Sequence, residues 1–128
     1  MPPINTRWVT GEDLIDNDTV AWANEFGEYL AQNEPKNPQM TTSQIRKFFG
    51  EVKRIQADFE KYRDDVPLLS AKLAYAAGRN KDVPRIKEFY KEFDIAIKAI
   101  NNSKENYHRF VKLLESTVAF HKLHGGKD

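Results

Sequence analysis

The 128-residue chain contains no cysteine. This absence excludes disulfide bonds, thiolate metal sites and cysteine nucleophiles, because each of them needs a Cys sulfur. A chain without cysteine also fits a reducing compartment, where disulfides are rare. We therefore expect a cytoplasmic protein.

Long apolar runs are missing as well. A helix that crosses a bilayer needs about 20 consecutive, mostly apolar residues, and no stretch of this sequence approaches that length. Residues 1–5 do not have the basic region followed by an apolar stretch that marks a secretory signal. These features predict a soluble, intracellular chain.

Motifs that carry catalysis are also absent. The six glycines include one adjacent pair, Gly125 and Gly126, and there is no P-loop, dinucleotide fingerprint or nucleophile elbow. His121 and His124 are spaced to share an ion, but no carboxylate accompanies them at ligand spacing. Paired acids such as those at 64–65 sit at expected helix boundaries, where acids usually cap helices. We therefore predict no metal, no other cofactor and no enzymatic activity.

The chain does contain enough apolar material for one core. Hydrophobic residues make up 40% and aromatic residues 12% of a length that fits a single domain. The net charge is only +1, but it is unevenly spread. Residues 1–40 hold two basic and seven acidic residues, whereas residues 41–128 hold eighteen basic and twelve acidic. We predict an acidic N-terminal leader with a first helix at 1–40, followed by a helical body at 41–128.

Five segments have the spacing of apolar side chains that is typical of amphipathic helices. They cover residues 18–32, 42–63, 68–77, 82–102 and 103–124. Short connections between them predict an all-α fold, a compact antiparallel bundle of about five helices. Residues 1–15 and 33–40 are predicted to lie outside helices. The third segment is almost wholly apolar, so we expect it to be buried on most sides.

Two helix starts carry capping signals. Residues 16–18, Asp-Asn-Asp, offer N-caps for the first helix. Thr41 with Gln44 matches a capping box for the second, because the two side chains can each bond the other's backbone N–H.

The second segment carries a cationic stripe opposite its apolar face. At about 100° per residue, the stripe combines basic and small side chains, namely Arg46, Lys47, Lys53, Arg54, Lys61, Gly50 and Ala57. Small residues let a phosphate backbone approach a helix closely, and arginine adds bidentate geometry. Glu51 and Asp58 fall at the edge of the stripe, so we expect it not to be neutralised along its length. The alternative is a solvated face with ordinary ion pairs to these acids.

Two further basic groups are candidates for RNA contact. One comprises Lys72, Arg79 and Lys81, of which the first two face the same way on the third segment. The other is on the last segment and comprises Arg109, Lys112 and Lys122, together with His108, His121 and His124. His121 falls close to the apolar face, which predicts a partly buried, hydrogen-bonded ring.

Most aromatic side chains belong to the apolar faces, so the sequence predicts no platform on which bases stack. If the chain binds RNA, we expect contacts to the backbone more than to the bases. Two apolar residues, Ile95 and Leu123, fall outside the core faces. Together with the acidic leader they suggest a surface that contacts a protein partner.

Three stretches form an ordered pattern. Residues 41–48 read T-T-S-Q-I-R-K-F, residues 69–79 read L-S-A-K-L-A-Y-A-A-G-R, and residues 115–127 read E-S-T-V-A-F-H-K-L-H-G-G-K. In order and spacing they resemble the small subunits of type III-A (Csm-type) CRISPR effector complexes, whose signature segment is K-L-A-Y-A-x-x-R. The resemblance covers residues 41–127, and residues 1–38 match nothing in that pattern.

The resemblance implies a non-catalytic, RNA-binding small subunit that stacks in several copies along the guide RNA–target RNA channel of an interference complex. Its implied partners are other copies of itself, the backbone repeat subunit, the large polymerase-like subunit, and the backbones of guide RNA and target RNA. By position, Arg46, Lys72 and Arg79 match the family's basic residues.

The competing hypothesis is a helical protein–protein adaptor with no nucleic-acid role, whose site is Ile95 and Leu123. A metal-dependent nuclease is a third hypothesis and rests on His121 and His124 alone.

Overall fold

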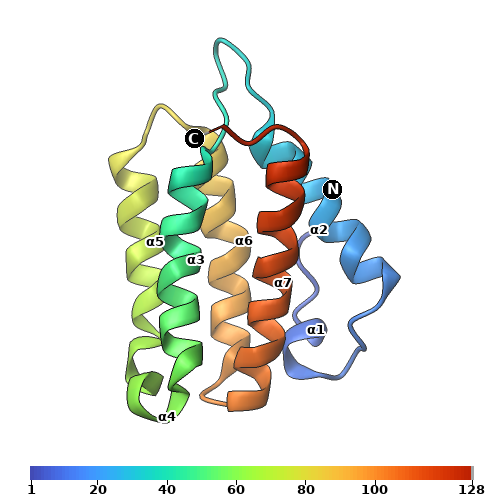
Figure 1. Cartoon of the computed structure of the whole chain (residues 1–128), viewed down its shortest axis with the longest axis vertical. Helices are drawn as coiled ribbons and strands as arrows, with labels where there is room; N and C mark the ends of the chain where they lie inside the picture. The colour runs from blue at the N-terminus through green and yellow to red at the C-terminus, as the bar shows by residue number, and fades with distance from the viewer. Residues whose placement is uncertain (128) are drawn as a thin grey trace.

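The computed structural model of the chain describes residues 1–127. Five long helices stand side by side, and each runs opposite to the one before it (Figure 1). They are α2 (Asn17–Ala31), α3 (Thr42–Ala57), α5 (Leu68–Arg79), α6 (Pro84–Ile100) and α7 (Lys104–Leu123). Residues 1–127 contain no β-strand, only an isolated bridge between Glu34 and Asn37. The all-α class is confirmed.

Three short helical pieces bring the helix count above the predicted five. They are α1 (Arg7–Thr10), α4 (Phe59–Tyr62) and the 3₁₀ turn η1 (Arg63–Asp65). The predicted continuous helix over 42–63 is broken at Asp58, which has φ −148° and ψ 75° and whose side chain accepts a hydrogen bond from the Lys61 N–H at 3.3 Å. Aspartate competes with helical hydrogen bonding in this way, so it ends α3 and caps α4.

The prediction that residues 1–15 lie outside helices is wrong, because α1 forms there. Its Trp8 and Val9 are buried, and Gly11 ends it in the left-handed region at φ 83°. The last carbonyls of a helix lack partners within it. Here Arg109 of α7 is the hydrogen-bond partner of two such carbonyls. Its Nε donates to the Val9 carbonyl (3.0 Å) and its Nη2 donates to the Thr10 carbonyl (3.3 Å). Tertiary contacts therefore hold α1.

Both capping signals are confirmed. The Asp16 side chain accepts from the backbone of Asp18 and Thr19, and the Thr19 hydroxyl bonds back to the Asp16 N–H at 3.0 Å. The Thr41 hydroxyl accepts from the Gln44 backbone N–H at 3.2 Å, while the side-chain Oε1 of Gln44 accepts from the Thr41 N–H at 2.7 Å. These bonds satisfy the free N–H groups at the starts of α2 and α3.

The acidic leader packs into the body through α2, which makes its most extensive contacts with α7. At the crossing of α2 and α7, a Cβ on Gly27 would lie 2.7 Å from the backbone nitrogen of His121 and 2.9 Å from the Phe120 Cβ. Only glycine therefore fits there without movement. His121 is fully buried, and its Nε2 lies 2.6 Å from the Met40 carbonyl. The hydrogen bond that the sequence predicted for this ring is confirmed.

A buried arginine fixes the loop between α2 and α3. Arg85 is 1% exposed. Its Nη1 donates to the Tyr29 carbonyl at 2.9 Å and its Nη2 pairs with the Glu34 carboxylate at 3.0 Å. These bonds satisfy the guanidinium away from water and hold residues 33–38, which project beyond the end of the bundle (Figure 1).

Candidate nucleic-acid interface

The helix that carries the K-L-A-Y pattern, α5, lies at the edge of the bundle (Figure 1). Only Leu69 and Leu73 of α5 are buried, so the prediction that this segment is buried on most sides is wrong. Its other apolar residues are mostly alanines, which favour a helix wherever they point. Alanine content therefore made α5 look like a core helix, whereas it offers most of its surface to solvent.

Three exposed side chains share one face of α5. At about 100° per residue, Lys72, Tyr75 and Arg79 fall within about 60° of one another. All three are exposed, and Tyr75 is 69% exposed. The seven-residue spacing of the two cations puts them two turns apart, with the tyrosine between them.

A groove of about 620 Å³ runs between α3 and α5. Its apolar lining comes from three helices and includes Phe48, Leu73 and Phe89. The basic residues that line it are Lys47 from α3 and Lys72 and Arg79 from α5. The fold thus brings one cation of the predicted α3 stripe together with two from the next group, across a gap with an apolar floor.

One acid moderates the charge of the groove. The Glu51 carboxylate accepts from the Lys72 ammonium at 2.6 Å and from Arg54 at 3.3 Å. The Lys72 hydrogen bond is the main reason that the pKa of the Glu51 carboxyl is lowered. Arg54 also pairs with Asp65 at 3.0 Å. Glu51 therefore neutralises part of the α3 stripe, at Arg54. The sequence had predicted that the stripe would keep its charge along its length.

Other predicted cations stay unneutralised. Within residues 1–127 no ion pair involves Arg46, Lys47, Arg79, Lys81 or Lys112, and each of these side chains is exposed. Lys53 lies 3.9 Å from Glu115, at the limit of an ion pair. A Cβ on Gly50 would meet nothing within 4 Å, so the middle of the α3 stripe is open to close approach.

Two predicted cations on α7 lie apart from the groove. The Arg109 guanidinium is engaged by the end of α1 and by the Asn106 side chain at 2.7 Å. Lys122 donates to the Gly126 carbonyl at 3.2 Å near the C-terminal end of α7. Neither lines the groove. None of the six predicted basic and histidine positions on the last segment lines this groove.

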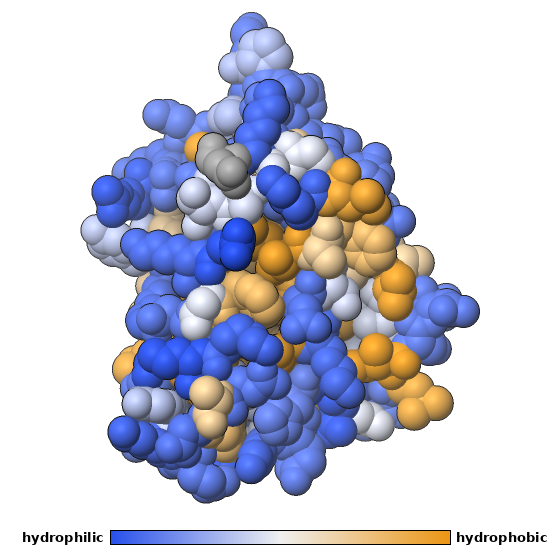
Figure 2. Space-filling view, in the orientation of Figure 1, coloured by the Kyte–Doolittle hydropathy of each residue, from blue (hydrophilic) through white to orange (hydrophobic). Residues whose placement is uncertain are grey.

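One face of the molecule divides into a hydrophilic side and a more apolar side. In Figure 2, hydrophilic side chains cover most of the left side, over α3 and α5. Apolar side chains show between the helices and along the right edge, over the loop before α2, over α2 and over the upper end of α7 (Figures 1 and 2).

Tyr75 is the residue of the groove that sequence reasoning missed. It is the one aromatic residue among 1–127 that is exposed, whereas the prediction placed most aromatic residues on the core faces and saw no aromatic platform. The available signal was its angular position, because Tyr75 lies on the same face as Lys72 and Arg79 and away from Leu69 and Leu73.

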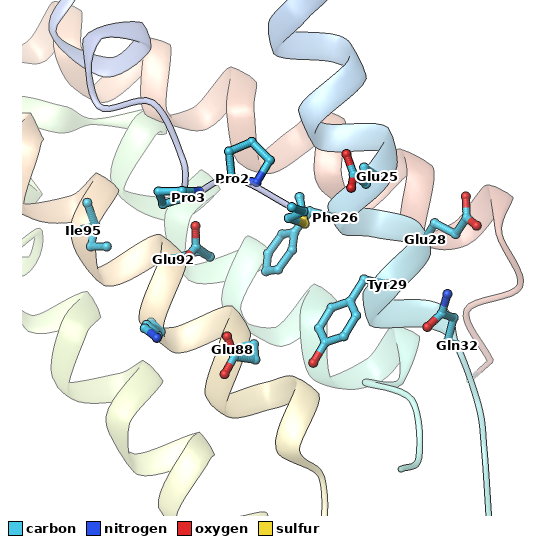
Figure 3. A pocket seen from close by; sticks show the side chains of 12 residues that line it. Pro2, Pro3, Glu25, Phe26, Glu28, Tyr29, Gln32, Glu88, Glu92 and Ile95 are labelled. Atoms are coloured by element: carbon cyan, nitrogen blue, oxygen red, sulfur yellow. The ribbon is translucent and has the colours of Figure 1, made fainter.

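A second hollow, of about 820 Å³, lies between the N-terminal segment, α2 and α6. Figure 3 shows its side chains, with Phe26 and Tyr29 from α2 and Ile95 from α6 among them. Four glutamates and one lysine also line it, namely Glu25, Glu28, Glu88, Glu92 and Lys91. Ile95 is 38% exposed and Leu123 is 71% exposed. Of the two predicted protein-contact residues, only Ile95 belongs to this hollow.

Among residues 1–127, no group of three or more His, Asp or Glu side chains is placed to hold a metal ion. Within the same residues, no helix combines the length and apolar character needed to cross a membrane.

Comparison with known proteins identifies the family. The model of a family described as Csm2 Type III-A matches residues 14–127. The chain belongs to the Csm2 family. A Csm2 relative from Streptococcus thermophilus, named "CRISPR system Cms protein Csm2", is 31% identical over 120 residues, which is 90% of this chain and 98% of the relative. No solved structure matches.

Membership of the Csm2 family confirms the type III-A small-subunit family predicted from residues 41–127. The match also begins earlier, at residue 14. Most of the acidic leader, which the three sequence blocks left unassigned, is therefore part of the family domain.

Proposed function

We propose that this Csm2-family chain is a non-catalytic RNA-binding small subunit of a type III-A CRISPR interference complex. Its α3 and α5 cations contact the phosphate backbone of guide RNA and target RNA without sequence specificity. The observation that carries the proposal is the gathering of Lys47, Lys72 and Arg79 on one groove. Arg46 and Lys53 are exposed on the side of α3 that faces away from the groove and form a separate candidate contact. Lys81 follows in the loop after α5.

The chemistry of this surface suits phosphate more than bases. Lysine and arginine neutralise phosphates and release counterions, and this term is independent of sequence. Arg54 and Lys72 give their hydrogen bonds to Glu51 in the free chain, so RNA has to compete with that carboxylate. A single copy therefore binds weakly, and useful affinity comes from several copies on one strand.

The test is the salt dependence of RNA binding. In the variant Lys47→Ala/Lys72→Ala/Arg79→Ala, three phosphate contacts are removed. For single strands the slope of log K against log salt is about −0.7 per phosphate neutralised, so the slope should flatten by about 2. Fluorescence anisotropy with labelled RNAs of unrelated sequence measures this, and all sequences should weaken alike.

A matched variant controls for net charge. Lys36, Lys87 and Lys104 are exposed, and they line neither the groove nor the hollow beside Ile95. Their triple alanine variant should keep most of the native slope. Equal slopes in the two triple variants would contradict a localised RNA surface. Loss of binding to one sequence with retention of another would show that bases are read.

For the protein partners, we propose that the acid-lined hollow beside Ile95 docks neighbouring subunits. These are other copies of the chain, the backbone repeat subunit and the large polymerase-like subunit. The hollow and the cationic groove lie on different sides of α6, since Glu88 and Ile95 line one while Ile86 and Phe89 line the other. Charge complementarity between the two surfaces supports a row of copies.

The adaptor hypothesis stays as the second candidate, because the same hollow favours it. An adaptor would bind a protein partner at Ile95 and ignore RNA. Two results together would favour the adaptor. The tagged chain would co-purify with a protein partner after nuclease treatment, and the purified chain would not bind RNA at low salt.

A further inference from the structure

We infer that the α3/α5 groove takes an unpaired nucleotide, whose base stacks on the Tyr75 ring while its flanking phosphates contact Lys72 and Arg79. This inference rests on the proposed RNA-binding function and adds a strand preference to it. The ligand class is single-stranded RNA, or a single unpaired nucleotide within a longer RNA.

The first support is the surroundings of Tyr75. Its side chain is 69% exposed. Within residues 1–127 it makes no hydrogen bond and no contact with another aromatic ring. By contrast, Tyr107 is fully buried and donates to the Val52 carbonyl at 2.8 Å, and Tyr62 lies under the Arg54 guanidinium. The Tyr75 ring is thus available to an external partner.

The second support is the order of groups along α5. Lys72 precedes Tyr75 by one turn and Arg79 follows it by one turn. At 1.5 Å per residue the two cations lie about 10 Å apart along the helix axis, with the ring between them. One nucleotide with its two neighbouring phosphates presents the matching order, phosphate, base, phosphate.

The third support is the lining of the groove next to Tyr75. Its polar lining comes from Gln44, Lys47, Glu51 and Asn80, and its accessible apolar surface comes from Ala71 and Ala76. A base that leaves water gains from an apolar surface, and an aromatic ring offers its face to any base. The polar walls leave the charged backbone at the rim.

These contacts discriminate between paired and unpaired RNA. In an A-form duplex the faces of the bases are covered by their neighbours, and proteins reach mainly the backbone and the 2′-hydroxyls. Tyr75 has no base face to contact there. The cations, however, serve duplex and single strand alike. Removing the ring should therefore affect only RNA with accessible base faces.

The experiment compares the full chain with Tyr75→Ala and Tyr75→Phe by fluorescence anisotropy at low salt. The probes are a labelled uridine strand of about 10 nucleotides, an abasic ribose–phosphate strand of equal length, and an RNA duplex of equal length. Tyr75→Ala should weaken the uridine strand about 5- to 150-fold, the range for one stacked base. It should leave the abasic strand and the duplex unchanged, and Tyr75→Phe should bind as the native chain does.

Leu68→Ala is the matched control, because Leu68 is 55% exposed on α5 and does not line the groove. It should leave all three affinities unchanged. Native-like binding of the uridine strand by Tyr75→Ala overturns the inference and leaves the proposed function standing. Equal weakening of the uridine and abasic strands also overturns it, because the ring then supports only the backbone contacts. Failure of the native chain to bind any of the three RNAs contradicts the proposed function itself.

Discussion

His121 joins three separate parts of the chain at one buried ring. Its Nε2 lies within hydrogen-bond distance of the Met40 carbonyl. Its backbone nitrogen packs against Gly27 of α2, and a Cβ on Gly126 would clash with its ring. The Nδ1 atom is buried and has no hydrogen-bond partner in residues 1–127. The ring is therefore neutral, with its proton on Nε2 donated to Met40.

The burial of His121 predicts a loss of stability in mild acid. Desolvation, together with the nearby charge of Lys122, lowers the pKa of His121 in the folded chain, although the Met40 bond opposes this. The unfolded chain takes up the proton near its ordinary pKa of about 6.5, and the folded chain does so only at lower pH. The free energy of unfolding contributed here is present above about pH 6.5 and falls as the pH drops toward the lower folded pKa.

Urea denaturation at several pH values between 7.5 and 5 measures this effect. His121→Gln should be less stable than the native chain at pH 7.5, and the difference should shrink as the pH falls. His108→Gln on the same helix is the control and should keep the native pH dependence. If the difference in unfolding free energy between His121→Gln and the native chain stays constant over this pH range, His121 is not the source of the loss of stability in acid.

Two helices contain a mid-helix glycine with opposite surroundings. Gly27 of α2 lies where α2 crosses α7, and Gly50 of α3 faces open space. Glycine costs a helix interior about 0.5–1 kcal/mol relative to alanine. It is therefore needed in α2 and dispensable for the fold in α3.

This contrast predicts opposite stability changes for one substitution. Gly50→Ala should raise the free energy of unfolding by about 0.5–1 kcal/mol, because the added methyl meets no atom. Gly27→Ala should lower it by about 1–3 kcal/mol, because the methyl overlaps the α7 backbone at His121. Chemical denaturation of the two variants checks both signs. Stabilisation by Gly27→Ala would mean that α2 and α7 do not cross as closely as the structure has them.

The whole molecule has two distinct surfaces with α6 between them. The cationic groove lies between α3 and α5, and the acid-lined hollow lies between α2, α6 and the N-terminal segment. Surfaces of opposite charge at different places on one subunit make heterologous contacts, which form an open row and need not close into a ring. Such contacts are screened by salt, so we expect the free chain to be monomeric or dimeric.

Native mass spectrometry of the assembled complex tests this arrangement. We expect several copies per particle, with more copies on a longer guide RNA. Glu25→Lys/Glu88→Lys places two cations in the hollow and should reduce the copy number. Asp64→Lys/Glu105→Lys makes the same change of charge at exposed positions outside the hollow and should not. A single copy at every guide length would contradict the stacking proposal.

Local interactions account for what the amino-acid sequence by itself determined. The five long helices, the caps at Asp16 and Thr41, and the Csm2 family follow from periodicity, capping and short motifs. Each of these depends on residues within a few positions of one another, so each can be read along the chain. The positions of Lys72 and Arg79 on one face of α5 follow in the same way.

Tertiary structure alone decided which side chains are free. Arg109 bonds Val9, 100 residues away, so a predicted RNA contact supports α1. Arg85 is buried by a loop about 50 residues distant, and Glu51 reaches Lys72 across the groove. The exposure of Tyr75 likewise depends on α5 lying at the edge of the bundle. Such partners meet only when helices pack, because no local pattern states which helix will lie beside which.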